Sequence, residues 1–260
     1  MNIVTCDVLG PAAANTGIGN QMFNVAAAYA LAWRDGCEVR LPCLNDSNKY
    51  GKAVNSIFKN VCKLPVYEIR QEFIEKSFNF EEFPKVTKNT KINGYFQSEK
   101  YFNNFEDQIK LLFSPDNETL SYIHERYSNL LKDNSTVSVH IRRGDYVKLA
   151  DIHGLLYMNY YEEAMRRFPN HRFVMFSDDI EWCKENFRNC TFIEGESEVV
   201  DFYLMSFMKS NVIANSTFSW WSAWLNSNPD KIVIAPSKWF GPENSHLDIS
   251  DIIPEGWIKI

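Results

Sequence analysis

The stretch VSVHIRRGDY, from Val137 to Tyr146, constrains the fold of this chain more than any other. Apolar and polar residues alternate over its first six positions, and this period of two is typical of a strand with one apolar face. Arg143 and Gly144 then predict a basic turn at the end of the strand, followed by Asp145. Ligands of open α/β sheets bind outside the carboxyl ends of the strands, so this turn is a candidate ligand site.

Two interpretations of the turn compete. An arginine fixed there suits a diphosphate, because the guanidinium presents a planar, permanently charged set of donors. The alternative is a surface turn in which Arg142 or Arg143 pairs with Asp145. Taken alone, the turn favours neither, so the rest of the chain has to decide.

Length and composition narrow the class of protein. A chain of 260 residues with 45% apolar residues can form one large or two modest domains with a full core. The net charge of -6 argues against a nucleic-acid partner. The six cysteines lack metal-ligand spacing and no signal peptide is recognisable, which favours reduced thiols and a cytoplasmic location. No apolar run reaches the roughly 20 residues of a transmembrane helix, although peripheral association with the inner face of a membrane is compatible with the sequence.

The second half of the chain alternates short apolar strands with amphipathic helices. This order predicts a parallel sheet with helices on both faces. The strands are expected at 137–142, 172–176, 191–193, 211–214 and 231–235, with helices at 160–168, 179–187, 198–209 and 217–226.

Polar residues follow three of these strands at their predicted carboxyl ends. They are Arg142 to Asp145, Ser177 to Asp179, and Asn215 to Thr217. Helix capping is the simpler explanation for Asp179 and for Ser216 or Thr217. Capping alone does not account for all three groups meeting at one edge, so we expect a ligand there.

The first half is less regular. A strand at 2–9, a loop containing Gly17 and Gly19, and a helix at 20–34 predict a βα unit whose glycines and helix N-terminus are open to a ligand, or else a plain βα turn. Further elements are expected as a short strand at 39–41, a helix at 54–64, strands at 66–69 and 91–96, and helices from Ser98 and over 120–130. The aromatic segment 73–83 receives no role. A polar break at 133–135 predicts domains at 1–135 and 136–260.

Five motifs in order carry a family resemblance. The chain resembles the bacterial α-1,2-fucosyltransferases of glycosyltransferase family 11 over nearly its whole length. The motifs are GIGNQMF (17–23), GYFQSEKYF (94–102), HIRRGDY (140–146), FSDD (176–179) and NSTFSWWSAWL (215–225). One departure is the loop at 10–16, which is longer than usual and bears on the shape of the acceptor side.

The resemblance implies an α/β fold of GT-B type, with two Rossmann-like domains that face a cleft. Residues 1–135 would form the acceptor side and residues 136–260 the side that binds the donor GDP-fucose. The implied reaction is inverting transfer of L-fucose from GDP-fucose to the 2-hydroxyl of a galactoside. The implied acceptor is an oligosaccharide or a lipid-linked glycan, and no metal or cofactor takes part.

The resemblance and the chemistry together assign roles to residues. Arg142 is expected to stabilise the charge that grows on the leaving diphosphate. Asp145 is expected to be the general base, with Asp151 the next carboxylate along the chain, although Asp145 could instead orient an arginine. Substrate binding is expected of Gly19, Asn20, Gln21, His140, Arg143, Asp151, Ser177, Asp178, Asn215, Ser216, Thr217 and Phe218.

Several alternatives remain open from the sequence. Asp178 and Asp179 are adjacent rather than spaced as Asp-x-Asp, which favours the metal-free mechanism. His140 shares a face with Arg142 and is either a nucleotide contact or a buried structural histidine. Trp220, Trp221 and Trp224 are expected to pack in the core rather than stack on sugar. Another GDP-sugar transferase, similar to protein O-fucosyltransferases, or a non-catalytic nucleotide- or carbohydrate-binding module would share part of the pattern.

Overall fold

The computed structural model describes residues 1–6, 17–41 and 51–260, and its contacts divide the chain into two compact units. Unit 1 comprises Met1–Ser114 with Leu247–Pro254, and unit 2 comprises Pro115–His246 with Glu255–Ile260. The boundary predicted after Ser135 falls inside unit 2. The loop at 10–16, which the sequence marks as long, and the end of the strand predicted at 2–9 lie outside the described residues.

Unit 1 is built on a sheet of four parallel strands in the order β2-β1-β4-β3. The strands are β1 (Ile3–Thr5), β2 (Glu38–Val39), β3 (Gln71–Ile74) and β4 (Thr90–Asn93). Helix α1 (Ile18–Asp35) follows β1, as predicted, and ends at Gly36 in the left-handed conformation. The strand predicted at 66–69 is wrong. Glu68 has a positive φ of 53°, which interrupts extended backbone, and pairing with β4 begins only at Gln71.

The predicted helix from Ser98 is also corrected. It is divided into η2 (Glu99–Tyr101), η3 (Asn103–Phe105) and α3 (Glu106–Leu112), because Phe102 leaves the helical conformation with φ -143°. A further short helix, α2 (Gly51–Ile57), lies earlier in the chain.

The two ends of the aromatic segment 73–83 belong to the core, whereas the residues between them are exposed or half-buried. Phe73 and Phe83 are buried and pack on each other with ring centroids 4.9 Å apart. Both rings also contact Phe96, and Phe83 contacts Tyr101. The segment therefore holds the GYFQS stretch against the sheet.

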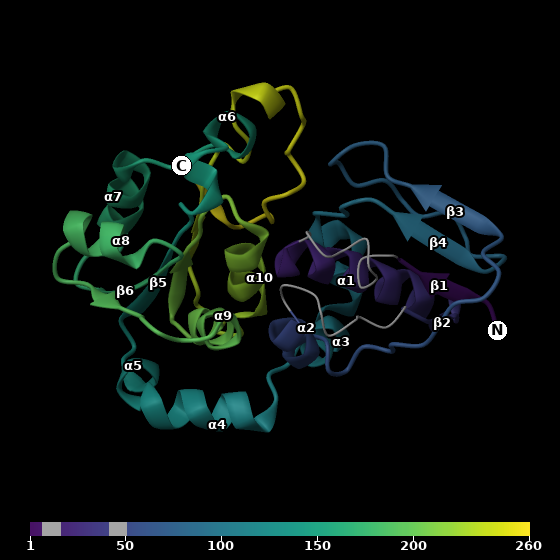
Figure 1. The fold of residues 1–260 in the computed structure, drawn as a ribbon, viewed down its shortest axis with the longest axis horizontal. Coiled ribbons are helices and arrows are strands. Elements are labelled where there is room, and N and C mark those ends of the chain that lie inside the picture. Colours follow the sequence, from purple (N-terminus) through teal and green to yellow (C-terminus); the bar gives the residue numbers. More distant parts are fainter. Residues whose placement is uncertain (7–16, 42–50) are drawn as a thin grey trace. The chain divides into compact units, whose positions relative to one another are not determined.

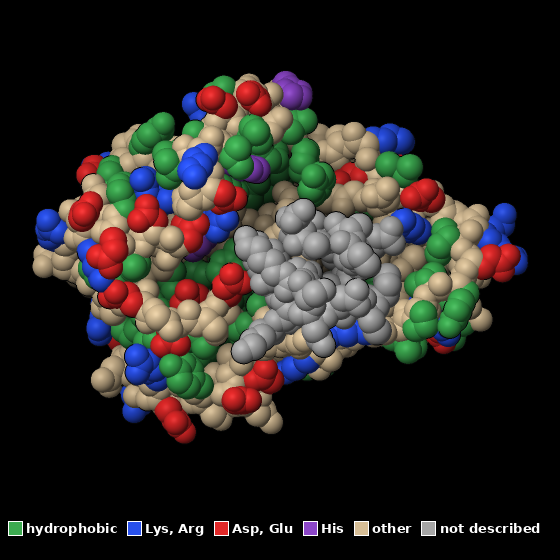
Figure 2. Space-filling model, viewed as in Figure 1, with side chains coloured by type: hydrophobic (Ala, Val, Ile, Leu, Met, Phe, Trp, Pro, Cys, Tyr) green, Lys and Arg blue, Asp and Glu red, His purple; other side chains and the backbone are tan. Residues whose placement is uncertain are grey.

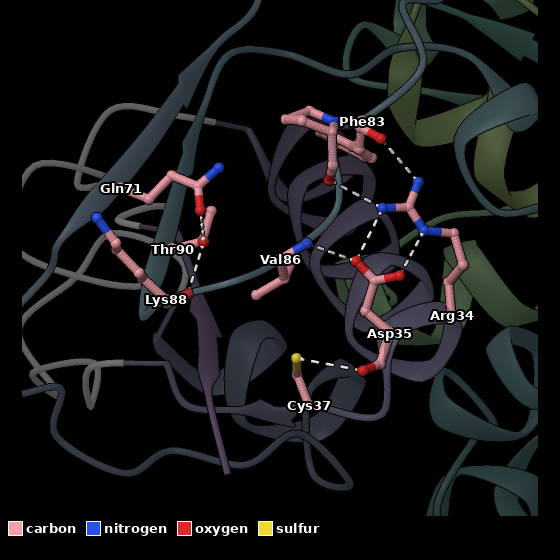
Figure 3. A network of polar contacts seen from close by, with 9 residues as sticks. Arg34, Asp35, Cys37, Gln71, Phe83, Val86, Lys88 and Thr90 are labelled. Atoms are coloured by element: carbon pink, nitrogen blue, oxygen red, sulfur yellow. Dashed lines mark hydrogen bonds and ion pairs between the residues drawn. The ribbon is translucent and has the colours of Figure 1, made fainter.

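A charged network fixes the end of α1 in unit 1 (Figure 3). The Arg34 guanidinium pairs with Asp35 at 2.9 Å and donates to the carbonyl of Phe83, also at 2.9 Å. The Asp35 carboxylate accepts the backbone N–H of Val86 at 2.7 Å. The ion pair lowers the pKa of Asp35, so the carboxylate stays charged. The network thus ties the last turn of α1 to the segment that leads into β4.

Unit 2 contains a sheet of six parallel strands in the order β10-β9-β8-β5-β6-β7 (Figure 1). These are β5 (Thr136–Ile141), β6 (Arg172–Ser177), β7 (Thr191–Phe192), β8 (Ser210–Val212), β9 (Val233–Ala235) and β10 (Ile258–Lys259). The order reverses between β5 and β8, which is the Rossmann arrangement. The parallel sheet predicted for the second half is confirmed, and β10 is an addition to it.

Both faces of this sheet are covered by helices. Val137, Val139 and Ile141 pack against α7 (Met158–Arg166) and α8 (Ile180–Asn186). The opposite face of β5 meets α9 (Glu198–Ser206) and α10 (Thr217–Leu225). All six residues of β5 are buried, so its polar alternation does not mark a solvent face. Trp220, Trp221 and Trp224 in α10 are buried, which confirms their predicted core role.

Helices α4 (Asn117–Arg126) and α5 (Ser128–Lys132) belong to unit 2 because they are tied to the N-terminal end of α9. Tyr122, Arg126 and Tyr127 all contact one carboxylate oxygen of Glu196, at 3.1, 2.9 and 2.6 Å. This packing explains why the compact units divide at 114/115.

Three further helical turns complete unit 2: η4 (Asp145–Val147), α6 (Ala150–His153) and η5 (Pro242–Asn244). Among the described helices, none is long and apolar enough to cross a membrane. Acidic and basic side chains are interspersed on the face drawn in Figure 2.

Candidate active site

The candidate site of unit 2 is built by the neighbouring strands β5 and β6. Their parallel register places Ile141 opposite Ser177, so the residues that follow each strand meet at the same edge. The Arg142 guanidinium lies between two carboxylates there. Its Nη2 is 2.6 Å from Asp145 Oδ1 and its Nη1 is 2.8 Å from Asp178 Oδ2. The sequence alone left open whether Arg142 pairs with Asp145, and the structure shows that pair together with a second one.

Arg143 points to a different carboxylate. Its Nε is 3.0 Å from Asp179 Oδ2, and its guanidinium lies 4.0 Å from the centre of the Trp182 ring. Asp179 also caps α8, since it accepts the backbone N–H of Trp182 at 3.4 Å. The predicted capping role of Asp179 is therefore confirmed, and the same side chain holds Arg143 in place.

Asp178 binds the backbone of the turn in addition to the side chain of Arg142. Its Oδ1 accepts the backbone N–H groups of Arg143 and Gly144 at 2.8 and 3.2 Å. A Cβ on residue 144 would stand 2.5 Å from Asp178 Oδ2, so any other residue there would displace this carboxylate. One carboxylate thus fixes both the backbone of the turn and the guanidinium that leaves it.

The charge of Arg142 is secured by these neighbours. Burial acts against the charge, but Asp178 and Asp145 outweigh it and raise the pKa of Arg142. Tyr146 supplies an aromatic face, with the guanidinium carbon 5.4 Å from the ring centre. Burial raises the pKa of Tyr146 to about 12, so its hydroxyl remains protonated and donates to the backbone oxygen of Asn215 at 3.2 Å.

The Tyr146 ring also stacks on His153, with centroids 4.7 Å apart and planes 14° from parallel. His153 ends α6, and Asn215 fixes that end. The Asn215 side-chain amide donates to the carbonyls of His153, Gly154 and Trp239 at 2.6, 2.9 and 3.0 Å. Asn215 is only 3% exposed, and its hydrogen bonds hold the segment that carries Asp151 and His153 in place.

The other residues of the 215–218 group lie around the start of α10. Ser216 occupies the N-cap position, but its side chain makes no capping hydrogen bond. Thr217 is the first residue of the helix, and the Phe218 ring lies 5.8 Å from the imidazole of His140.

His140 is buried, with 7% of its surface exposed. Burial, and then the nearby charge of Arg142, lower the pKa of His140 to about 3. The imidazole is therefore neutral at physiological pH and adds no positive charge to the site. Its Nδ1 has no hydrogen-bond partner among the described residues.

Two carboxylates and a hydroxyl complete the predicted set in unit 2. The Asp145 side chain is 53% exposed and keeps its second oxygen outside the ion pair. Asp151, in the first turn of α6, is exposed and makes no side-chain hydrogen bond to any described residue. Ser177 Oγ accepts the backbone N–H of Asp179 at 2.9 Å.

In unit 1 the predicted residues lie at the start of α1. Gly19 and Gln21 are buried, whereas Asn20 is half-buried. Asn20 Oδ1 accepts a hydrogen bond from Gln97 Nε2 at 3.0 Å. Strands β1 and β4 are neighbours in the sheet, so α1, which comes after β1, and the GYFQS stretch, which follows β4, meet at one edge.

The sequence left several of these contacts unpredicted. Tyr146, Trp182 and Gln97 each touch a predicted site residue, yet no role was assigned to them. Tyr146 and Gln97 lie inside the quoted motifs, which was the available signal. The contacts themselves depend on which strands are neighbours, and spacing along the chain does not reveal that. Among the described residues, no group of three His, Cys, Asp or Glu side chains could hold a metal ion.

Comparison with known proteins places this geometry in context. Residues 12–260 match the model of the family described as Glycosyl transferase family 11. An α-1,2-colitosyltransferase of Escherichia coli is 34% identical, over 100% of this chain and 99% of that protein. The O-antigen biosynthesis glycosyltransferase WbnK of E. coli is 32% identical, over 94% of this chain and 98% of that protein.

The fold is similar to that of NodZ, a fucosyltransferase from Bradyrhizobium. The alignment with the crystal structure of NodZ α-1,6-fucosyltransferase soaked with GDP-fucose covers 88% of this chain and 97% of the NodZ chain. Its TM-score is 0.54 and the sequence identity is 14%. The predicted fold class, α/β with two Rossmann-like units as in GT-B glycosyltransferases, is confirmed.

Proposed function

We propose that this chain, which belongs to glycosyl transferase family 11, transfers L-fucose from GDP-fucose to the 2-hydroxyl of a galactoside, with inversion at the anomeric carbon. The family membership supplies the reaction class. The proposed donor is supported by the likeness in fold to NodZ, which was crystallised and soaked with GDP-fucose.

The observation that carries the proposal is the position of Arg142. Its guanidinium is held by Asp145 and Asp178 at the carboxyl end of β5, where the strand order of unit 2 reverses. A dinucleotide or nucleotide diphosphate binds at this point in Rossmann folds. A cation that is fixed before the reaction stabilises developing negative charge without a cost of reorganisation.

The proposed reaction breaks one bond at the anomeric carbon and forms another. The bond between the anomeric carbon and the diphosphate oxygen breaks, and its electron pair leaves with GDP. The acceptor oxygen forms its bond to the anomeric carbon from the opposite face, and its proton passes to a carboxylate. We assign the diphosphate to Arg142 and the proton to Asp145, whose second oxygen remains outside the ion pair with Arg142. Arg143, Ser177 and Asp178 are proposed to line the donor site with His140 and Phe218.

The transfer is proposed to be independent of metal ions. In this account Arg142 takes the role that a divalent cation has in other nucleotide-sugar transferases. The carboxylates of Asp178 and Asp179 support the proposal because they are engaged with Arg142, Arg143 and the backbone of the turn.

The proposed acceptor is an oligosaccharide or a lipid-linked glycan. WbnK is named for O-antigen biosynthesis, which supports a glycan acceptor. Transfer is proposed to take place in the cytoplasm, at the inner face of the membrane. We assign acceptor contacts to Asn20 and Gln21 in unit 1.

Colitose is the second candidate sugar, because one full-length relative is a colitosyltransferase. Colitose is the 3-deoxy counterpart of fucose, so the two donors differ by one hydroxyl. A site that hydrogen-bonds this hydroxyl would reject GDP-colitose by a factor on the order of 10⁴, whereas a site without such a contact would accept both donors.

The decisive experiment incubates the protein with GDP-fucose or GDP-colitose and a panel of β- and α-linked galactosides. We expect release of GDP with fucose transferred in an α-1,2 linkage, identified by NMR of the product. Preference for GDP-colitose would change the donor but keep the reaction class. Binding of GDP with no turnover on any galactoside would favour a non-catalytic module.

A further inference from the structure

A hydrogen bond joins the side-chain amides of Gln97 and Asn20. Gln97 Nε2 donates to Asn20 Oδ1 at 3.0 Å. A side-chain amide has one acceptor oxygen and one donor NH₂ group. Because Gln97 engages the oxygen, the part of the Asn20 amide that remains is its NH₂ group. No described residue accepts a hydrogen bond from Asn20 Nδ2, and Asn20 is half-buried in the first turn of α1.

Gln97 makes this bond at a cost. It is 4% exposed, and its own Oε1 has no hydrogen-bond partner among the described residues. A buried amide oxygen without a hydrogen-bond partner destabilises the folded chain. An apolar side chain of the same length would avoid that cost, so packing alone does not explain a glutamine here.

The surroundings of Gln97 fix its position. Ser98, the next residue, is buried and its Oγ accepts the backbone N–H of Lys100. On the other side, the amide of Asn24 reaches the carbonyls of Asn20 and Tyr95 at 3.2 and 3.4 Å. The Asn24 side chain thereby attaches the GYFQS stretch to α1 without the Gln97 side chain.

We infer that Gln97 is a positioning residue, which orients the Asn20 amide so that its NH₂ group faces an acceptor oxygen of a sugar substrate. This inference rests on the proposed function, since it takes Asn20 as a substrate contact. The oxygen could belong to the nucleotide sugar or to the galactoside. Both present ether, hydroxyl or phosphate oxygens, and kinetic constants measured for each substrate distinguish the two sources.

The test is a cycle of Gln97→Met, Asn20→Ala and the double variant, assayed for transfer with each substrate varied in turn. Methionine keeps the length of glutamine but cannot hold the Asn20 oxygen. We expect Gln97→Met to lower kcat/KM about tenfold for the substrate that Asn20 contacts, in line with the loss of one oriented hydrogen bond. In the Asn20→Ala background, Gln97→Met should change kcat/KM less than about twofold, since it acts through Asn20.

Thermal unfolding supplies a readout that does not depend on activity. The melting temperature of Gln97→Met should match or exceed that of the wild type, because the lost hydrogen bond is offset by removal of the unpaired oxygen. A fall of several degrees would assign Gln97 a merely structural role and overturn the inference. Wild-type kcat/KM in either single variant, or additive losses in the double variant, would also overturn it.

Thr5→Val is the matched control. Thr5 lies in β1 of the same unit, is 3% exposed, and its Oγ1 has no hydrogen-bond partner among the described residues. Valine keeps the shape of threonine and removes an unpaired buried oxygen, but it breaks no hydrogen bond to Asn20 or Gln97, so kcat/KM should stay near the wild-type value. If the wild type transfers no fucose, the proposed function fails independently of this inference. The same variants are then assayed with the donor that does support transfer. If no donor supports transfer, the variants are compared by calorimetric titration with GDP and with galactosides.

Discussion

The two units carry different chemistry at the carboxyl edges of their sheets. In unit 2 the residues after β5 and β6 are charged, and Arg142, Asp145 and Asp178 form a connected set of ion pairs. In the described part of unit 1, the amides of Asn20 and Gln97 meet through one hydrogen bond, and the carboxylate of Glu75, which follows β3, accepts backbone N–H groups after β4 and pairs with no arginine or lysine among the described residues. The charged network of unit 1 lies at the other end of α1, around Arg34 and Asp35.

Burial explains the difference. The charged side chains of Arg142 and Asp178 are about one-third exposed, so water shares the cost of their charge. Gln97 and Asn24 are almost fully buried, where an unpaired charge would be far more costly than a neutral amide. The comparison is consistent with the proposed placement of the diphosphate at the edge of unit 2 and of hydroxyl-bearing groups at the edge of unit 1.

The strongest test of the charged edge is Arg142→Ala. We expect a loss of turnover of about 10³-fold or more, with weaker binding of GDP, because the preformed cation is removed. Arg142→Lys should restore little, since a single ammonium cannot contact Asp145, Asp178 and a diphosphate together. The measurements are steady-state kinetics and calorimetric titration with GDP.

Arg167→Ala is the control for that variant. Arg167 is exposed in unit 2 and its contact with Glu163 is 3.5 Å long. Kinetics of Arg142→Ala that resemble those of Arg167→Ala would remove Arg142 from the site and leave the comparison of the two edges without its main support.

The next largest effects are expected from Asp145 and Asp178, whose substitutions should affect different steps. Asp145→Asn should slow transfer at least about 100-fold while GDP-fucose binds within a few-fold of wild type, because Asp178 still holds Arg142. Asp178→Asn should instead weaken donor binding about tenfold, because it loosens Arg142 and the turn together. Binding and single-turnover rates measure the two losses separately.

Asp151→Asn completes this series. Its carboxylate is exposed and makes no side-chain hydrogen bond to a described residue, so it is the alternative proton acceptor. A pure loss of kcat in Asp151→Asn, combined with collapsed donor affinity in Asp145→Asn, would reverse the two roles. If neither change slows transfer, the base lies elsewhere, and His153 or a residue of unit 1 would be the next to examine.

Removal of metal ions is expected to leave the transfer activity unchanged. Activity should be the same in EDTA as in added Mg²⁺ or Mn²⁺, because arginine supplies the positive charge. Loss of activity in EDTA that Mg²⁺ restores would place a cation at Asp178 or Asp179 and contradict the assignment of the charge to Arg142.

Asp201 lies outside both groups of predicted site residues, and its pKa gives a test of stability rather than of activity. Burial, and then Glu196 and Glu198, raise the pKa of Asp201 to about 7. A carboxyl whose pKa is raised on folding stabilises the fold at low pH, and this contribution is lost as the pH rises through about 7. The melting temperature of Asp201→Asn should therefore exceed that of the wild type by a margin that grows between pH 4 and 7 and then stays constant at about 5 °C.

The same variant should leave kcat/KM unchanged, since Asp201 contacts neither group of predicted site residues. A margin that is independent of pH would show that the carboxyl is not protonated in the folded protein.

Local pattern in the sequence determined much of the fold. The period of two in β5 and the period of 3.6 in α1 and α10 follow from backbone geometry, so strands and helices of unit 2 were predicted close to their observed bounds. The order of polar residues after the strands of unit 2 also predicted that Arg142, Asp145 and Asp178 meet at one edge, because parallel strands bring their carboxyl ends together. The predictions failed at 66–69, where Glu68 has a positive φ, and around Phe102, where the backbone leaves the helical conformation.

Only the tertiary structure decided which side chains meet. That Asp178 accepts the N–H groups of the Arg143–Gly144 turn depends on β5 and β6 being neighbours. That His140 is neutral depends on α10 covering its face of the sheet, because burial lowers its pKa more than the nearby charge of Arg142 does. That Gln97 orients Asn20 depends on β4 lying beside β1, although the two strands are separated by most of unit 1. Periodicity acts over a few residues, whereas hydrogen bonds and desolvation act across space, and the site is made of the second kind of interaction.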